Sequence, residues 1–181
     1  SNGLCNQCYA LKYLILPNSI TQINVYLCNA CYNLEKVVLP ISVPTYYTDN
    51  SFNGCRSLKK VILPKDLVTV GRSMFENCTQ LTNIALPLTI AQISSRAFFG
   101  TAIDILTIPN TSTLIESAFG NSPILKYIFL PIGYNSNANF LTSYNSLTKE
   151  CLIDIATALQ DNSTTQTIKT ITFSQYAKKV F

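Results

Sequence analysis

A ten-residue phrase that recurs six times constrains this chain more than any other feature of its sequence. Its clearest copy runs from Cys55 to Pro64 and reads Cys-Arg-Ser-Leu-Lys-Lys-Val-Ile-Leu-Pro. Every copy ends on a proline, and successive prolines lie 22 to 24 residues apart, at positions 17, 40, 64, 87, 109 and 131. Self-similarity at such a period is typical of proteins in which each repeat forms one coil and buries its apolar side against the next coil.

Three apolar positions within the phrase predict a short strand. In the third copy they are Leu58, Val61 and Leu63, and the other copies keep apolar residues at the same places. This spacing favours a parallel strand whose inward side chains share one core. The proline then ends the strand, because it has no backbone N–H to donate. Apolar residues three and six positions further on, such as Leu67 and Val70, predict a second wall for each coil.

The chain departs from the repeat after Pro131. Residues 132–145 are mostly polar and predict a loop. Leu147, Cys151, Leu152 and Ile155 belong to an apolar stripe at helical spacing, which predicts a helix near residues 147–160. Residues 168–173 return to the strand pattern and predict a seventh strand on the same sheet. We therefore expect one domain over residues 1–181, with repeats at 3–131, a loop at 132–145, and a helix and last strand within 146–174.

The repeat resembles the BspA-like leucine-rich repeats of bacterial and protist surface proteins, whose unit runs approximately Ala-Phe-x-x-Cys-x-x-Leu-x-x-Ile-x-Ile-Pro. The segment from Phe52 to Pro64 matches that unit almost place for place, and the resemblance covers residues 3–131. With it, the predicted fold is a right-handed leucine-rich repeat solenoid of the α/β class, rich in β-structure. A parallel concave sheet of about seven short strands would be followed by the helix and strand segment at the C-terminal end.

The resemblance also implies a location and a class of function. It predicts an extracellular or cell-surface protein, of the secreted adhesion type, that binds proteins or glycans, and the family has no shared catalytic residues to carry over. The first residues already lie inside a repeat, so we expect the chain to be a piece of a longer protein.

Composition excludes several other classes of function. Hydrophobic residues make up 48% of the 181 residues, but no stretch reaches the roughly 18 consecutive apolar residues of a membrane-spanning helix, so we expect no membrane insertion by this chain. The net charge of +4 is too small and too scattered for a nucleic-acid-binding surface. The chain contains no histidine, and acidic residues such as Asp104 and Glu116 are isolated. We therefore predict no enzymatic activity and no cofactor.

The cysteines leave three alternatives open. Cys5, Cys8, Cys28 and Cys31 have the spacing of a four-cysteine zinc site, which would make the protein a zinc-stabilised repeat domain. A disulfide between Cys5 and Cys28 is a second alternative, because equivalent residues of stacked coils lie about 5 Å apart. The default interpretation is that both pairs occupy repeating core columns as buried reduced thiols, which act as small hydrophobes.

Residues that alternate with the core positions of each strand should point to the concave face of the sheet, where we expect a ligand to bind. They predict a binding site that comprises Tyr13, Ile15, Lys36, Val38, Lys60, Ile62, Asn83, Tyr127 and Phe129. The competing interpretation is that β-branched residues simply make good strands.

The charge of this face predicts the chemistry of its partner. Five lysines (12, 36, 59, 60 and 126) outnumber Glu35 and Asp104 there, a net charge of +3. We expect a recognition or adhesion module that binds an acidic protein segment or anionic glycan, such as an acidic host extracellular component. The alternative is a structural spacer or array segment of a larger surface protein.

Overall fold

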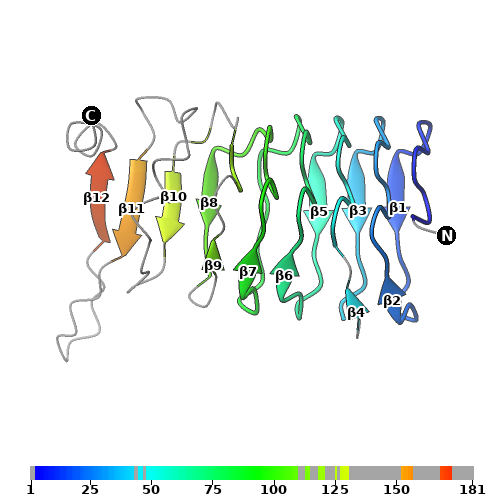
Figure 1. Ribbon diagram of the computed structural model, residues 1–181, viewed down its shortest axis with the longest axis horizontal. Helices are drawn as coiled ribbons and strands as arrows, with labels where there is room; N and C mark the ends of the chain where they lie inside the picture. The colour runs from blue at the N-terminus through cyan, green and yellow to red at the C-terminus, as the bar shows by residue number, and fades with distance from the viewer. Residues whose placement is uncertain are drawn as a thin grey trace.

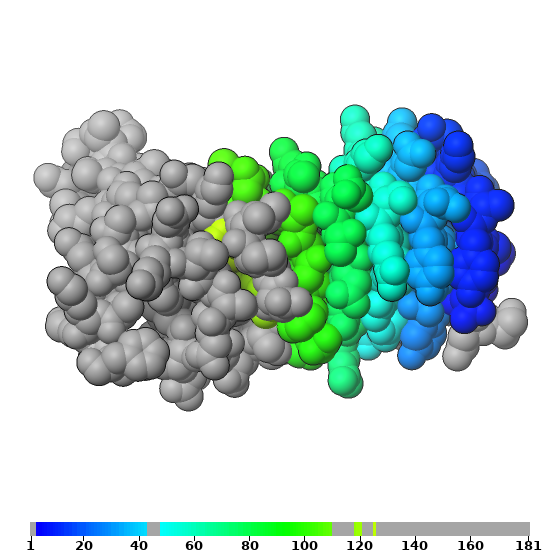
Figure 2. All heavy atoms as spheres, turned by 90° about the horizontal axis from the view of Figure 1, so that it is seen from above, coloured from blue at the N-terminus to red at the C-terminus, as the bar shows by residue number. Residues whose placement is uncertain are grey.

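The computed structural model of the chain describes residues 3–42, 45–46, 48–109, 113–114, 118–120, 125, 127–130, 152–156 and 168–172. Successive repeats form coils that lie side by side along the longest axis of the molecule (Figure 1), and they appear as parallel bands of colour when the molecule is seen from above (Figure 2). The described residues form strands and turns and contain no helix. In particular, none of them belongs to a helix long and apolar enough to cross a membrane.

One short strand from each of five repeats forms the set that we call the repeat strands. They are β1 (Tyr13–Ile15), β3 (Lys36–Val38), β5 (Lys60–Ile62), β8 (Ile105–Thr107) and β10 (Tyr127–Leu130). All pairings among them are parallel and join equivalent residues, so that Leu14 pairs with Val37 and Val37 with Val61. The parallel strands predicted from the phrase are thus confirmed.

The fourth repeat does not contribute a strand to this set. Residues 83–85 stand at the expected place but are not a strand, and the repeat strands therefore form two groups, β1-β3-β5 and β8-β10. Asn83 and Ala85 are residue types that strands disfavour, which accounts for the interruption. The core is unaffected, because Ile84 between them is buried.

Two-residue strands on the other wall of the coils form what we call the second ladder. They are β2 (Gln22–Ile23), β4 (Thr45–Tyr46), β6 (Thr69–Val70), β7 (Gln92–Ile93) and β9 (Thr113–Leu114). The parallel pairings are β2 with β4, β6 with β7 and β7 with β9. Ile23, Leu67, Val70, Ile90 and Ile93 are buried, which confirms the predicted second wall for the coils in which they lie.

A third set of contacts, which we call the turn ladder, joins the turns that precede the repeat strands. The N–H of Cys5 donates to the carbonyl of Leu27 at 2.8 Å. Equivalent bonds link the later coils, from Cys28 to Ser51, Phe52 to Met74, Phe75 to Ala97 and Phe98 to Ala118. This series runs without interruption through the first six repeats.

The turn ladder includes left-handed residues at two positions of each coil, of which Gly3, Tyr26, Asn50, Ser73 and Arg96 occupy the first and five others the second. At the second position, Gln7, Ala30, Gly54, Asn77 and Gly100 all have positive φ angles. The N–H of each one donates to a carbonyl of the next coil, for example from Ala30 to Asn53 at 2.7 Å. A residue with a Cβ atom is strained in this conformation, whereas glycine is not.

The core is built from columns of equivalent side chains. Phe52, Phe75, Phe98 and Phe119 stack with ring centroids 5.7, 5.6 and 5.4 Å apart and are fully buried. Beside them, Leu34, Leu58 and Leu81 are 0% exposed, and Val61 and Leu63 pack against the same core. The inward positions predicted from the phrase are therefore confirmed.

The C-terminal end corrects the sequence prediction. Residues 152–156, placed in a helix by their apolar spacing, form the strand β11 (Leu152–Ala156), which pairs in parallel with β10. A short apolar run fits either period, and the unpaired backbone edge of β10 favours a strand. The rest of the expected helix and the loop at 132–145 lie outside the described residues. The expected last strand is present as β12 (Ile168–Thr172), but it runs antiparallel to β11.

We predict that truncation of one stacked ring is costly. Phe75→Ala should lower the free energy of unfolding by about 3–5 kcal/mol, because it opens a cavity between two rings of the column. Phe99→Ala is the matched control, since Phe99 is only half-buried and lies outside the column. Urea denaturation measures both, and equal losses would contradict the importance of the column.

We also predict that the left-handed positions prefer glycine. Ala30→Gly should raise the free energy of unfolding by about 0.5 kcal/mol, because relief of strain outweighs the entropy gained by the unfolded chain. Gly54→Ala should lower it by about 0.5–1 kcal/mol through strain alone, since an added Cβ meets its nearest neighbour, the Cα of Ala30, at an ordinary 3.7 Å. Ala10→Gly, at a residue whose φ is not positive, should be destabilising. Stabilisation by that control change would contradict the explanation.

Candidate functional site

The outward positions of the first three repeat strands form a continuous face. On β1 the side chain of Ile15 is 68% exposed, and on β5 that of Ile62 is 44% exposed. Val38 lies between them in register and is half-buried. Alternation along a strand sends their neighbours Leu14, Val37 and Val61 to the core side.

A second column of this face combines an aromatic ring with two lysines. Tyr13, Lys36 and Lys60 are paired in register on β1, β3 and β5. Lys36 and Lys60 lie on adjacent strands, which are about 4.8 Å apart in a sheet. The register therefore brings their two side chains next to each other. The strand residues β1, β3 and β5 include no acidic side chain, and this column is therefore positively charged.

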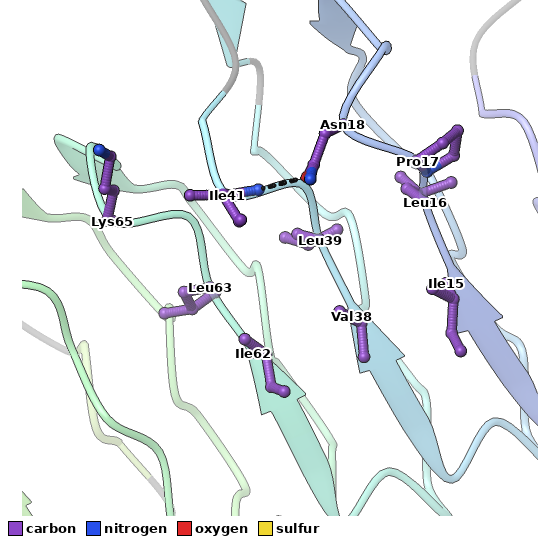
Figure 3. A pocket seen from close by; sticks show the side chains of 10 residues that line it. All are labelled: Ile15, Leu16, Pro17, Asn18, Val38, Leu39, Ile41, Ile62, Leu63 and Lys65. Carbon is purple, nitrogen blue, oxygen red and sulfur yellow. Dashed lines mark hydrogen bonds between the residues drawn. The ribbon is translucent and has the colours of Figure 1, made fainter.

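At the C-terminal ends of the same three strands the surface is hollowed into what we call the three-coil groove (Figure 3). It has a volume of about 460 Å³ and is lined by Ile15, Leu16, Pro17, Asn18, Val38, Leu39, Ile41, Ile62, Leu63 and Lys65. This volume falls within the range of about 300–1,000 Å³ that is usual for ligand sites.

The lining of the groove is almost entirely hydrocarbon. Its polar side chains are Asn18 and Lys65, and the Oδ1 atom of Asn18 already accepts a hydrogen bond from the N–H of Ile41 at 3.0 Å (Figure 3). Ile41 itself is 60% exposed. The groove therefore favours an apolar group that carries negative charge at its margin, where Lys65 lies.

The structure brings together most, but not all, of the predicted site residues. Tyr13, Ile15, Lys36, Val38, Lys60 and Ile62 share the face of β1, β3 and β5. Asn83 is exposed in the fourth repeat but is not on a strand. Tyr127 and Phe129 belong to β10, and their side chains lie outside the described part of the chain.

Sequence reasoning missed the residues that follow the prolines. Asn18, Ile41 and Lys65 each come directly after the proline of their repeat, and all three line the groove. This constant position in the repeat could have predicted that they lie on one side of the coils, just as the constant positions of the strand residues predicted theirs.

The thiols of the cysteine column have a structural role. Cys31, Cys55 and Cys78 each donate a hydrogen bond to a carbonyl of the preceding coil, that of Cys5, Cys28 and Phe52 respectively, with distances of 2.9, 3.0 and 3.1 Å. The six cysteines of the described residues are all free thiols. No group of three or more His, Cys, Asp or Glu side chains among the described residues is arranged to hold a metal ion. The burial of Cys28 and Cys31 and the hydrogen bond of Cys31 favour the buried-thiol interpretation for that pair. For the other pair the interpretation is corrected, because Cys5 is only half-buried and Cys8 is exposed.

Burial changes the acidity of these thiols. It raises the pKa of Cys55 to about 12 and that of Cys78 well above its ordinary value. A hydrogen bond between Cys28 and Cys31, together with burial, raises the pKa of Cys28. These three thiols are protonated at neutral pH, and a thiol that stays protonated is a poor nucleophile.

The buried carboxylate of the described region is also engaged. Glu76 forms an ion pair with Arg96, whose Nε donates to Oε2 at 3.1 Å. The hydrogen bond from Arg96 holds the pKa of Glu76 below its ordinary value. The Arg96 guanidinium also lies over the ring of Phe99, with its carbon 3.9 Å from the centroid. This arrangement fixes neighbouring turns and leaves no carboxyl group free for proton transfer there.

Stacked coils of 22–24 residues, each with one short parallel strand and apolar core columns, define a leucine-rich repeat protein. The chain belongs to the BspA-type leucine-rich repeat family. The sequence model of that family, described as BspA type leucine rich repeat region (6 copies), matches residues 1–126 and again residues 46–179. A search of the curated proteins found no match.

Solved structures with the same fold come from several bacteria. A leucine-rich repeat protein of Bacteroides ovatus is 26% identical with a TM-score of 0.64, over 72% of this chain and 36% of that one. One from T. pallidum is 25% identical with a TM-score of 0.63, over 68% of this chain and 60% of that one. A leucine rich cell surface protein of Faecalibacterium prausnitzii is 21% identical with a TM-score of 0.52, over 76% of this chain and 45% of that one. The chain thus spans less than two thirds of each of these proteins.

We predict that alkaline pH destabilises the fold through Cys55. The unfolded thiol ionises near its ordinary pKa of 9.0, whereas the folded one does so near 12, so stability declines as pH rises from about 9 towards 12. Between pH 8 and pH 10 the free energy of unfolding should fall by about 1 kcal/mol more in the wild type than in Cys55→Val. Urea denaturation at both pH values measures the difference, and equal declines would show that this thiol is not responsible.

Proposed function

We propose that the protein is a non-catalytic recognition module of the cell surface or the extracellular space. Membership of the BspA-type leucine-rich repeat family supports this class of function. The similar protein of Faecalibacterium prausnitzii is described as a cell surface protein, which supports the location. The absence of histidine and the ion pair of Glu76 with Arg96 agree with a module that does not catalyse a reaction.

The observation that carries the proposal is the three-coil groove beside a basic column. Three successive coils place Ile15, Val38 and Ile62 along one line, and Lys36 and Lys60 lie two residues earlier on their strands. An apolar surface of this kind supplies contact area, while the lysines select an acidic partner and speed its association. The ligand is therefore an extended acidic segment that crosses the repeat strands.

A protein segment fits this surface better than a glycan. A sugar chain needs many hydrogen-bonding groups, because its buried hydroxyls are otherwise left without partners. Eight of the ten lining residues are hydrocarbon, and the Asn18 oxygen is occupied by Ile41. Aliphatic side chains of an acidic peptide would fill the groove, with carboxylates directed to Lys36, Lys60 and Lys65.

A binding screen tests the proposal directly. The purified chain should bind saturably to acidic, aliphatic-rich peptides or to host extracellular-matrix proteins on an array that also carries mucins and anionic glycans. Saturable binding to glycans alone would contradict the choice of a protein ligand. Absence of saturable binding to any class would favour a structural spacer, and turnover of any substrate would overturn the non-catalytic assignment.

Charge reversal on the basic column should weaken binding of the selected partner. We predict that Lys36→Glu with Lys60→Glu lowers affinity at least tenfold and flattens its dependence on salt, because the favourable electrostatic term is removed. Ile62→Ser should instead speed dissociation with little change in the salt dependence.

The matched control is Arg72→Glu. Arg72 is exposed in the turn that follows β6, outside the repeat strands and the groove. Titration calorimetry or surface plasmon resonance at two salt concentrations measures all variants. If Arg72→Glu weakens binding as much as the lysine changes, the repeat-strand face is not the site.

A further inference from the structure

The two lysines of the basic column, Lys36 and Lys60, have no ionic partner among the described residues. The ion pair of that part of the chain joins Glu76 to Arg96 in the turns, and no described acidic side chain pairs with either lysine. Their strands β3 and β5 are parallel neighbours in register, so the two positive charges stand side by side. Like charges on directly opposite residues destabilise a sheet, and an anion held between them relieves that repulsion.

The spacing of the basic column matches one anionic group better than a row of carboxylates. Neighbouring strands lie about 4.8 Å apart, whereas side chains on one side of an extended ligand recur at about 6.7 Å. Successive acidic side chains of a ligand that crosses the strands therefore fall out of step with Lys36 and Lys60. A single group between the two lysines avoids this mismatch.

A tetrahedral ester fills that place better than a carboxylate. Sulfate and phosphate esters have three free oxygens, whereas a carboxylate has two, so an ester can accept hydrogen bonds from both lysines and from a third donor. The hydroxyl of Tyr13, which pairs in register with Lys36 on β1, is such a donor. The basic column therefore favours an ester oxyanion.

The apolar line beside the basic column selects a flat ring. Ile15, Val38 and Ile62 follow two residues after that column on the same three strands and lie in one row (Figure 3). Two residues of a strand span about 6.7 Å, and a tyrosine side chain covers about the same length from its Cβ atom to its ring oxygen. A ring that rests on Val38 and Ile62 thus carries an ester group to Lys36 and Lys60. Aspartate and glutamate offer no comparable apolar surface.

Sulfate suits this site better than phosphate. Both esters of tyrosine share the ring and the tetrahedral group, but phosphate carries close to two negative charges at neutral pH and sulfate carries one. Beside the hydrocarbon of Val38 and Ile62, the group with the smaller charge loses less hydration free energy. Lys60 is exposed, so solvent screens most of the extra attraction that a second negative charge would gain.

We propose that Lys36 and Lys60 bind the sulfate group of an O-sulfated tyrosine in a protein ligand, and that the ring of this tyrosine packs on Val38 and Ile62. This inference rests on the proposed function and names the chemical group by which the module selects its ligand. The sulfate takes the place of a carboxylate at the two lysines. Aliphatic side chains of the same segment fill the three-coil groove, and a carboxylate meets Lys65 at its margin.

A set of matched synthetic peptides tests the inference. All share one acidic, aliphatic-rich sequence, and their central residue is sulfotyrosine, tyrosine, glutamate or phosphotyrosine. We expect the sulfotyrosine peptide to bind at least tenfold more tightly than the tyrosine and glutamate peptides. Lys36→Gln and Lys60→Gln should each remove most of this advantage but weaken binding of the tyrosine peptide less than threefold. Titration calorimetry measures all pairs, with circular dichroism to verify that the variants are folded.

The matched control is Arg72→Gln, an exposed cation outside the repeat-strand face, which should leave the sulfotyrosine advantage unchanged. Equal affinity for the sulfotyrosine and glutamate peptides would overturn the inference and leave the proposed function intact. Tighter binding of the phosphotyrosine peptide than of the sulfotyrosine peptide would overturn the choice of sulfate. Absence of binding by all four peptides would count against the proposed function as well as the inference.

Discussion

The hydrogen bonds of the turn ladder pass from each coil to the next through equivalent backbone positions, and most other features follow from this register. Once Cys28 is bonded to Ser51 and Phe52 to Met74, each residue is fixed beside its counterpart one repeat away. A side chain in the core must therefore pack well against the side chains at the equivalent position of the neighbouring coils. Flat rings satisfy this condition by stacking, as Phe52, Phe75, Phe98 and Phe119 do.

The same register limits what the outer face can be. A lysine on one strand lies beside the equivalent residue of the next, so Lys36 and Lys60 become neighbours despite their mutual repulsion. Isoleucine and valine at the next outward position become a continuous apolar line. A face built this way presents the apolar line of Ile15, Val38 and Ile62 beside the column of Tyr13, Lys36 and Lys60. The extended acidic segment that we propose as ligand would meet both columns along its length.

The period and its apolar positions were sufficient to predict the core, because each position has one structural environment in every coil. Leu58, Val61 and Leu63 were placed correctly for that reason, as were Ile15, Val38 and Ile62 on the outer face. The three-coil groove was not predicted, since its shape depends on how the chain leaves the strand after each proline and exposes Asn18, Ile41 and Lys65. Residues 152–156 were misassigned because five residues fit both a helical and a strand pattern, and only a neighbouring strand edge distinguishes them.

The two strand ladders are interrupted at different coils, and this offset has a mechanical consequence. Among the described residues, the repeat strands lack a member at the fourth coil, where β6, β7 and β9 run continuously on the other wall. In the part of the second ladder that the structure describes, β4 and β6 are not paired, and at this joint β1, β3 and β5 are continuous. Each interruption therefore affects one wall of the coils only, and the other wall is continuous at that joint. A force along the long axis of the molecule must therefore break backbone hydrogen bonds of one ladder at each of these joints. Bending at an interrupted joint can separate the strands of one wall only if the paired strands of the other wall act as a hinge.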